Sequence, residues 1–150
     1  MDVTLRIKRY DPESTNGSAV WQEYPISIDE NATVLDALIQ IREDDDGTLS
    51  LRCSCRSAIC GSCAMRINGH GGLACKTKAS ESIGQDGIIT VEPAGNMETV
   101  KDLVADFDLF WDKIRQVEPY LQPQGEVPEG EYVVSNDSML HLSAVTACIM

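Results

Sequence analysis

Four cysteines in the middle of the chain have a spacing that suits metal chemistry. Cys55, Cys60, Cys63 and Cys75 form the pattern C-x4-C-x2-C-x11-C. A 2Fe-2S cluster contains two tetrahedral irons bridged by two sulfides, so the protein must supply four thiolates. Three thiolates on one loop allow the backbone to wrap around such a cluster, and the fourth then comes from a neighbouring strand. The spacing therefore predicts a 2Fe-2S site with these four cysteines as ligands, whose sulfurs converge on one small void.

Structural zinc is the main competing chemistry, because zinc is also bound by four cysteines with C-x2-C spacing. Zinc sites usually combine two short knuckles, whereas the second half of this pattern offers Cys75 alone. A catalytic thiol is disfavoured because neither histidine, His70 or His141, lies in a nucleophile motif. Cys53 lies outside the pattern. We interpret it as a small buried apolar residue that points away from the site, with a spare thiolate as the alternative.

The residues around the cysteines differ in charge from the rest of the chain. No Asp or Glu occurs from Gly47 to Ser80, although the net charge of the chain is -12. The basic residues of this stretch are Arg52, Arg56, Arg66, Lys76 and Lys78. A four-thiolate cluster is negative and becomes more negative on reduction, so nearby cations favour the reduced form and raise its potential. The alternative is a chance gathering of solvated side chains.

The composition is that of a globular protein with partners other than nucleic acid. The 150 residues suffice for one domain and part of a second. Because the chain is strongly acidic, we expect no nucleic-acid partner. No apolar stretch approaches the roughly 20 residues that span a bilayer, so we expect no direct membrane span. The six cysteines occur without an export signal, which suggests reduced thiols.

The first part of the chain predicts a small sheet packed on one helix. Apolar and polar residues alternate in 3–7 and again in 24–28, which is typical of a β-hairpin. Asn31 or Thr33 can cap a helix that ends at 44–47. The cysteine loop, a second hairpin turning at Asn68-Gly69 and a strand at 88–91 follow. This order predicts an α+β fold, with a β-grasp ferredoxin-like domain over residues 1–92 whose mixed sheet packs on one helix.

The second part predicts helices separated by an irregular linker. Apolar residues recur at helical spacing from Val100 to Ile114, which predicts one helix or two short ones. Pro119, Pro123 and Pro128 then interrupt the pattern. We therefore assign residues 93–136 to a helical connection and linker, which a weakly helical segment, 137–150, follows.

Two segments resemble the iron-sulfur subunits of succinate dehydrogenase and fumarate reductase. The first, CRSAICGSCAMRINGHGGLAC (55–75), resembles the ferredoxin-like domain of that family, and its eleven-residue gap separates it from soluble plant ferredoxins. The second, VEPAGNMETVKDLVADFDLFWDKIRQVEPYL (91–121), resembles the connection between the two domains of the family. Residue by residue, the resemblance implies that Cys55, Cys60, Cys63 and Cys75 are the 2Fe-2S ligands. Some family members have Asp at the position of Cys63.

The resemblance also implies a second, α-helical ferredoxin domain. In the family this domain opens with a C-x2-C-x2-C run and carries a 4Fe-4S and a 3Fe-4S cluster. Cys148, in ACIM, matches the first cysteine of that run, so we expect it to be the first 4Fe-4S ligand in a site that is incomplete here. Residues 137–150 would then be the truncated start of this domain, and the 4Fe-4S and 3Fe-4S clusters are expected only in a full-length chain.

The resemblance implies a function in electron relay. Such a subunit binds no substrate and passes single electrons between an FAD-containing flavoprotein subunit and a membrane anchor that handles quinone. We expect a peripheral protein, held by anchor subunits at the cytoplasmic face of the membrane. The alternative is a free-standing soluble ferredoxin, which the long segment after Glu92 disfavours. A third interpretation is a zinc-stabilised interaction module.

Overall fold

The computed structural model describes the chain except for residues 14–16, 120–124, 127–128, 132 and 147–150. The chain divides into a compact unit, Met1–Gln116, and a second part, Val117–Met150. The compact unit contains Cys55, Cys60, Cys63 and Cys75, and it extends beyond Glu92, where the first domain was expected to close.

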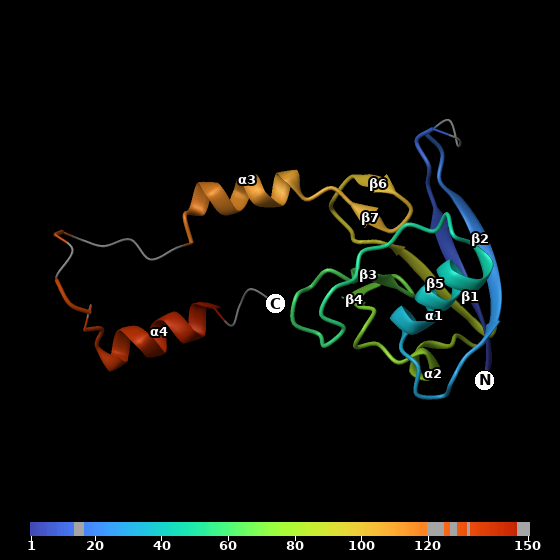
Figure 1. Cartoon of the computed structure of the whole chain (residues 1–150), viewed down its shortest axis with the longest axis horizontal. Coiled ribbons are helices and arrows are strands. Elements are labelled where there is room, and N and C mark those ends of the chain that lie inside the picture. The colour runs from blue at the N-terminus through green and yellow to red at the C-terminus, as the bar shows by residue number, and fades with distance from the viewer. Residues whose placement is uncertain (14–16, 120–124, 127–128, 132, 147–150) are drawn as a thin grey trace. The chain divides into compact units, whose positions relative to one another are not determined.

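The compact unit is built on a mixed five-stranded sheet (Figure 1). Its strands are β1 (Asp2–Arg9), β2 (Val20–Ser27), β3 (Ala64–Ile67), β4 (His70–Leu73) and β5 (Ile88–Pro93), in the spatial order β2-β1-β5-β3-β4. The central pair β1 and β5 is parallel, and the other neighbouring pairs are antiparallel. Asn68 and Gly69 adopt the left-handed backbone of a tight turn, with φ of 50° and 80°. Both expected hairpins and the mixed sheet are therefore confirmed.

One helix packs against this sheet, as the sequence predicts. Helix α1 (Val34–Gln40) begins at Thr33, whose hydroxyl accepts a hydrogen bond from the Asp36 N–H while the Asp36 carboxylate accepts one from the Thr33 N–H. A π-helical turn, η1 (Ile41–Asp45), continues α1 to the predicted end. The apolar side chains of this helical segment join those of β1 and β5 in one core: Val34, Leu35, Leu38, Ile41, Leu5, Ile7, Ile89 and Val91. Burying each one contributes roughly 1.5–3 kcal/mol. A short helix, α2 (Ala79–Ser82), precedes β5.

The segment after β5 differs from the prediction. The predicted helix from Val100 is wrong in its first half, where the chain forms a hairpin of β6 (Thr99–Lys101) and β7 (Val104–Ala105). Its second half is confirmed as α3 (Asp108–Val117). The physical reason is Asp102, which has a φ of 46°, a value that no α-helix accommodates. Its carboxylate is buried against groups far away in the sequence, which local spacing does not reveal.

The second part of the chain contains the helix α4 (Asn136–Thr146), in agreement with the helical segment expected from Asp137. The hydroxyl of Ser135 accepts a hydrogen bond from the Ser138 N–H and so caps its first turn. Cys148, the expected 4Fe-4S ligand, lies outside the described residues. Within the described part of the chain, no helix combines the length and the apolar character needed to cross a bilayer.

Candidate iron-sulfur site

The third and fourth cysteines of the pattern are positioned by the β3–β4 hairpin. Cys63 directly precedes β3, and Cys75 lies just beyond the end of β4. The Ala74 N–H donates to the Cys63 carbonyl oxygen at 3.1 Å, which ties the two ends of the hairpin together. Figure 1 shows the green loop that carries the other two cysteines next to this hairpin. The sheet therefore brings the return cysteine back to the loop.

Backbone N–H groups of the loop are directed at the cysteine sulfurs. Cys55 Sγ accepts hydrogen bonds at 3.3, 3.4 and 3.3 Å from the N–H groups of Ser57, Ile59 and Cys60. The N–H of Ala58, within the same run, donates to Cys75 Sγ at 3.3 Å. Successive N–H groups that face one concavity form an anion-binding nest, an arrangement common at iron-sulfur sites. This loop is therefore shaped to hold negatively charged sulfur.

The loop takes this shape through backbone conformations that only glycine adopts freely. Arg56, Ala58 and Gly61 have φ of 54°, 58° and 72°. For a residue with a Cβ, this left-handed region costs about 1–2 kcal/mol. Such strain persists where the surroundings over-determine it and is concentrated at functional sites. Neither Arg56 nor Ala58 is a residue type that signals a left-handed backbone, so sequence reasoning missed both.

Cys55 and Cys60 are joined directly. The Cys55 N–H donates to Cys60 Sγ at 3.5 Å, and the Cys60 N–H donates to Cys55 Sγ at 3.3 Å. On the hairpin, the neighbouring Cys75 contributes to the shifted pKa of Cys63. In the described part of the chain, no three His, Cys, Asp or Glu side chains are gathered to hold one metal ion. The convergence of all four sulfurs on one small void stays a prediction. A 2Fe-2S cluster fits this donor set, because each tetrahedral iron takes two protein sulfurs besides the two bridging sulfides.

The two pairs have different environments. Cys55 and Cys60 are exposed, Cys63 is buried and Cys75 is half-buried. The hydroxyl and the N–H of Ser62 both hydrogen bond with Cys60 Sγ, at 3.4 and 3.2 Å, and they lower the pKa of Cys60 to about 6. Burial, in contrast, raises the pKa of Cys63. Cys60 therefore favours the thiolate form that a metal requires even without metal.

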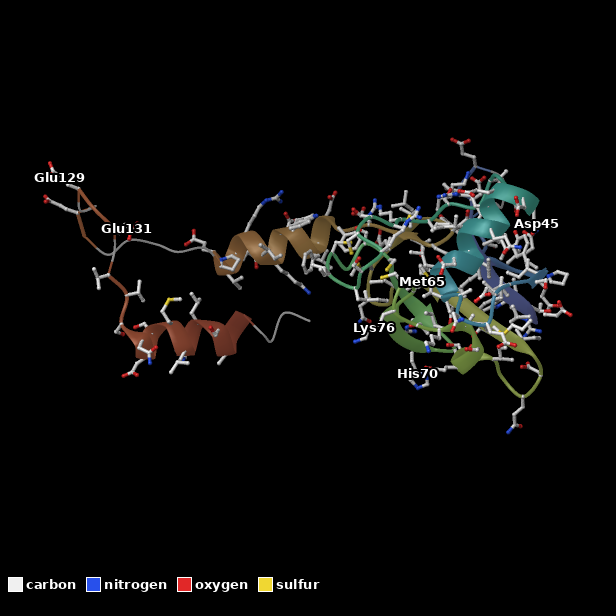
Figure 2. The ribbon with its side chains drawn as sticks, turned by 60° about the horizontal axis from the view of Figure 1, so that its bottom comes forward. Asp45, Met65, His70, Lys76, Glu129 and Glu131 are labelled. Carbon is white, nitrogen blue, oxygen red and sulfur yellow. The ribbon has the colours of Figure 1, made fainter. Side chains whose placement is uncertain are left out.

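The surroundings of the loop agree with the charge pattern of the sequence. The basic residues Arg52, Arg56, Arg66, Lys76 and Lys78 are all exposed, and Figure 2 shows Lys76 and His70 directed outward at this end of the unit. Cys53 is half-buried and packs against the hydrophobic core, in the kind of apolar setting that we preferred for it. Asp102, whose carboxylate accepts a hydrogen bond from the Ser50 N–H ahead of the loop, was not predicted as a site residue, and Arg52 was noted only for its charge.

Residues 4–112 match the family model of the 2Fe-2S iron-sulfur cluster binding domain. The chain therefore belongs to the family of 2Fe-2S iron-sulfur cluster binding domains. The predicted ferredoxin-like fold and 2Fe-2S cofactor agree with this family.

The relatives of the chain are more specific. It is 38% identical over 134 residues to the succinate dehydrogenase (ubiquinone) iron-sulfur subunit 1, mitochondrial, of Oryza sativa subsp. japonica, covering 84% of this chain and 47% of the relative. It is 36% identical over 152 residues to the corresponding mitochondrial subunit of Dictyostelium discoideum, covering 99% and 52%. The chain thus spans about half the length of these curated relatives.

A solved structure has a fold similar to that of this chain. The Mycobacterium smegmatis Sdh1 complex in the apo form contains a chain that matches with a TM-score of 0.85 and 28% identity, covering 99% of this chain and 59% of that one. The resemblance to succinate dehydrogenase iron-sulfur subunits is confirmed by these relatives.

Proposed function

We propose that this chain acts as the electron-transfer iron-sulfur subunit of a succinate dehydrogenase or fumarate reductase, with one 2Fe-2S cluster held by Cys55, Cys60, Cys63 and Cys75. The observation that carries the proposal is the nest of loop N–H groups directed at the sulfurs of Cys55, Cys60 and Cys75. Such a site provides both the thiolates and the positive dipoles that a negative cluster requires.

The residues of the chain have separate tasks in this proposal. The cluster, when bound, supplies one-electron redox chemistry. The N–H groups of Ser57 to Cys60 stabilise negative charge on the sulfurs, and more strongly so in the reduced state. The exposed basic side chains around the loop act in the same direction and raise the potential. No substrate-binding residue is assigned, because the dicarboxylate would be bound by another subunit.

The proposed partners are an FAD-containing flavoprotein subunit and a membrane anchor with quinone. Helix α3 offers an apolar docking face, since Leu109, Phe110 and Trp111 are 61%, 41% and 50% exposed. The protein would be peripheral, held by its anchor at the cytoplasmic face of the membrane. Cys148 would be the first ligand of a 4Fe-4S cluster, which together with a 3Fe-4S cluster would belong to a full-length chain.

The test is electron transfer from substrate. The chain, reconstituted with iron and sulfide under anaerobic conditions, is mixed with a succinate dehydrogenase flavoprotein subunit, and succinate is added. We expect the electron paramagnetic resonance (EPR) signal of a reduced 2Fe-2S cluster to appear only when both proteins and succinate are present. A cluster that dithionite reduces and the succinate-loaded flavoprotein does not would favour a free-standing ferredoxin instead.

The docking face is tested separately from the cluster. Trp111→Asp on α3 should weaken binding to the flavoprotein and leave the visible spectrum of the cluster unchanged. Val20→Asp is the matched control, because Val20 is equally exposed, at 50%, on the edge strand β2. Loss of the cluster in Trp111→Asp would show that α3 supports the cluster-binding fold and is not a docking face.

A further inference from the structure

The β6–β7 hairpin is bonded to the start of the cysteine loop. The Ser50 N–H donates to Asp102 Oδ2 at 2.9 Å, and the Leu103 N–H donates back to the Ser50 carbonyl oxygen at 3.2 Å. Two residues later, Arg52 Nη1 donates to the Ala105 carbonyl oxygen at 3.0 Å. The chain leaves these contacts only three residues before Cys55. The start of the loop is thus attached to a hairpin that lies some fifty residues further along the sequence.

Asp102 is the centre of this attachment. Its side chain is 1% exposed, and its carboxylate also accepts hydrogen bonds from Arg9 Nε at 2.9 Å and from the Tyr10 N–H at 3.0 Å. The left-handed backbone of Asp102, with φ of 46°, is strained for a residue with a Cβ. A buried carboxylate must be paired and hydrogen-bonded, and here the pairing joins the end of β1 to the start of the loop.

We propose that Asp102 is a positioning residue for the cluster, because it fixes the start of the cysteine loop at Ser50 and so sets the place of Cys55 and of the N–H groups that follow. This inference rests on the proposed function, since it concerns the same 2Fe-2S site. Among the described residues, no hydrogen bond joins the Asp102 carboxylate to a cysteine. It acts through the backbone, as the groups behind metal ligands commonly do.

The other end of the loop is held independently of Asp102. The Ala64 N–H bonds to the Gly61 carbonyl oxygen at 2.9 Å, and Ala74 bonds to Cys63 as described above. Cys63 and Cys75 are therefore fixed by the sheet, whereas Cys55 and Cys60 depend on the attachment at Ser50 and Arg52. Loosening this attachment should therefore shift Cys55 and Cys60 and leave Cys63 and Cys75 in place.

Asp102→Asn and Asp46→Asn form a matched pair for the test. Both carboxylates pair with Arg9, but Asp46 bonds to Arg9, Tyr24 and Thr48 and not to Ser50. An amide has one acceptor oxygen and no charge, so each variant should lower the unfolding temperature. Only Asp102→Asn should release iron from the reconstituted cluster to a chelator faster, by about tenfold, and change the EPR g-values. Equal release rates and identical spectra for the two variants would overturn the proposal.

Arg52→Ala keeps the proposal testable if Asp102→Asn does not fold, because Arg52 is exposed. Its guanidinium bonds to Ala105 and lies over the Phe107 ring, 5.4 Å from its centroid. Iron release should be faster in Arg52→Ala and close to wild type in Arg52→Lys, which keeps the charge and a donor. A wild-type rate in Arg52→Ala would contradict the role of the hairpin. A wild-type chain that binds no 2Fe-2S cluster would instead refute the proposed function.

Discussion

The two halves of the cysteine site are built in different ways. Cys63 and Cys75 flank a β-hairpin, and Cys63 is 3% exposed within the hydrophobic core. Cys55 and Cys60 are exposed on a loop outside the core, where N–H groups of a strained backbone hold their sulfurs. Cys63 and Cys75 are therefore positioned by the folded sheet. Cys55 and Cys60 depend on the local backbone conformation and on the attachment of the loop to the β6–β7 hairpin.

The difference explains how a small sheet offers four sulfurs to one cluster. Strands place side chains firmly, but they leave their own N–H groups bonded to neighbouring strands. A loop leaves its N–H groups free to face sulfur, at the cost of being harder to fix in place. Combining the two gives a half-site that holds its position and a half-site that supplies positive dipoles.

The largest expected effect separates ligand loss from loss of stability. Cys60→Ala and Cys63→Ala should each abolish the 2Fe-2S spectrum, because a cluster lacking one thiolate is not retained. In the metal-free proteins, Cys63→Ala should lower the free energy of unfolding by about 1 kcal/mol, since it removes a buried group, whereas Cys60→Ala should change it by less than about 0.5 kcal/mol. Urea unfolding measures both values. Equal destabilisation would remove the distinction between the two halves.

The strained backbone of the loop gives a second, smaller effect. Gly61 has a φ of +72° and open space where a Cβ would lie, so Gly61→Ala tests backbone conformation without a clash. We expect a loss of about 1 kcal/mol in the free energy of unfolding and faster release of iron to a chelator. The control is Gly71→Ala, because Gly71 also has open space and no left-handed φ. Similar behaviour of the two variants would show that the loop conformation is not fixed.

The two halves should also differ in thiol reactivity. In the metal-free protein, alkylation of Cys60 by iodoacetamide should rise through a midpoint near pH 6 and level off above it, because the thiolate is the reactive form and the pKa of Cys60 is lowered to about 6. Cys63, buried and with a raised pKa, should remain unmodified at pH 7. Mass spectrometry of the digested protein reports both sites. Faster modification of Cys63 than of Cys60 would contradict the structure.

The smallest effect concerns one hydroxyl group. Ser62 lowers the pKa of Cys60 through its side chain as well as its N–H, so Ser62→Ala should move the alkylation midpoint upward, toward the ordinary cysteine value of about 8.5. Ser57→Ala serves as the control, because the Ser57 hydroxyl donates to the Cys55 carbonyl oxygen and not to a sulfur. A midpoint near pH 6 in Ser62→Ala would assign the shift to backbone N–H groups alone.

Those parts of the fold that follow from local chemistry could be predicted from the sequence. The Thr33 cap, the Asn68-Gly69 turn and the alternating strands depend on residues close to one another in the chain. The hairpin around Asp102 could not be predicted, because its fold depends on Arg9 and Ser50, and the apolar residues around it happen to have helical spacing.

The candidate site was partly predictable for a similar reason. The spacing of the cysteines predicts which side chains are ligands, since thiolates at these intervals are typical of 2Fe-2S sites. The spacing does not predict the backbone dihedral angles between the cysteines, which decide where the N–H groups point. The left-handed φ of Arg56 and Ala58 arises from the complete loop and from its attachment to the sheet. The hydrogen bonds from the loop N–H groups to the cysteine sulfurs are likewise a property of the folded chain.

The most direct test of the central claim is the metal content of the reconstituted chain, measured together with its EPR spectrum. We predict two irons and two acid-labile sulfides per chain, with a spin-one-half signal after one-electron reduction. The count should be unchanged in Cys53→Ala and should fall to zero when Cys55, Cys60, Cys63 or Cys75 is replaced by Ala. Stoichiometric zinc without iron, or loss of the cluster in Cys53→Ala, would contradict the account.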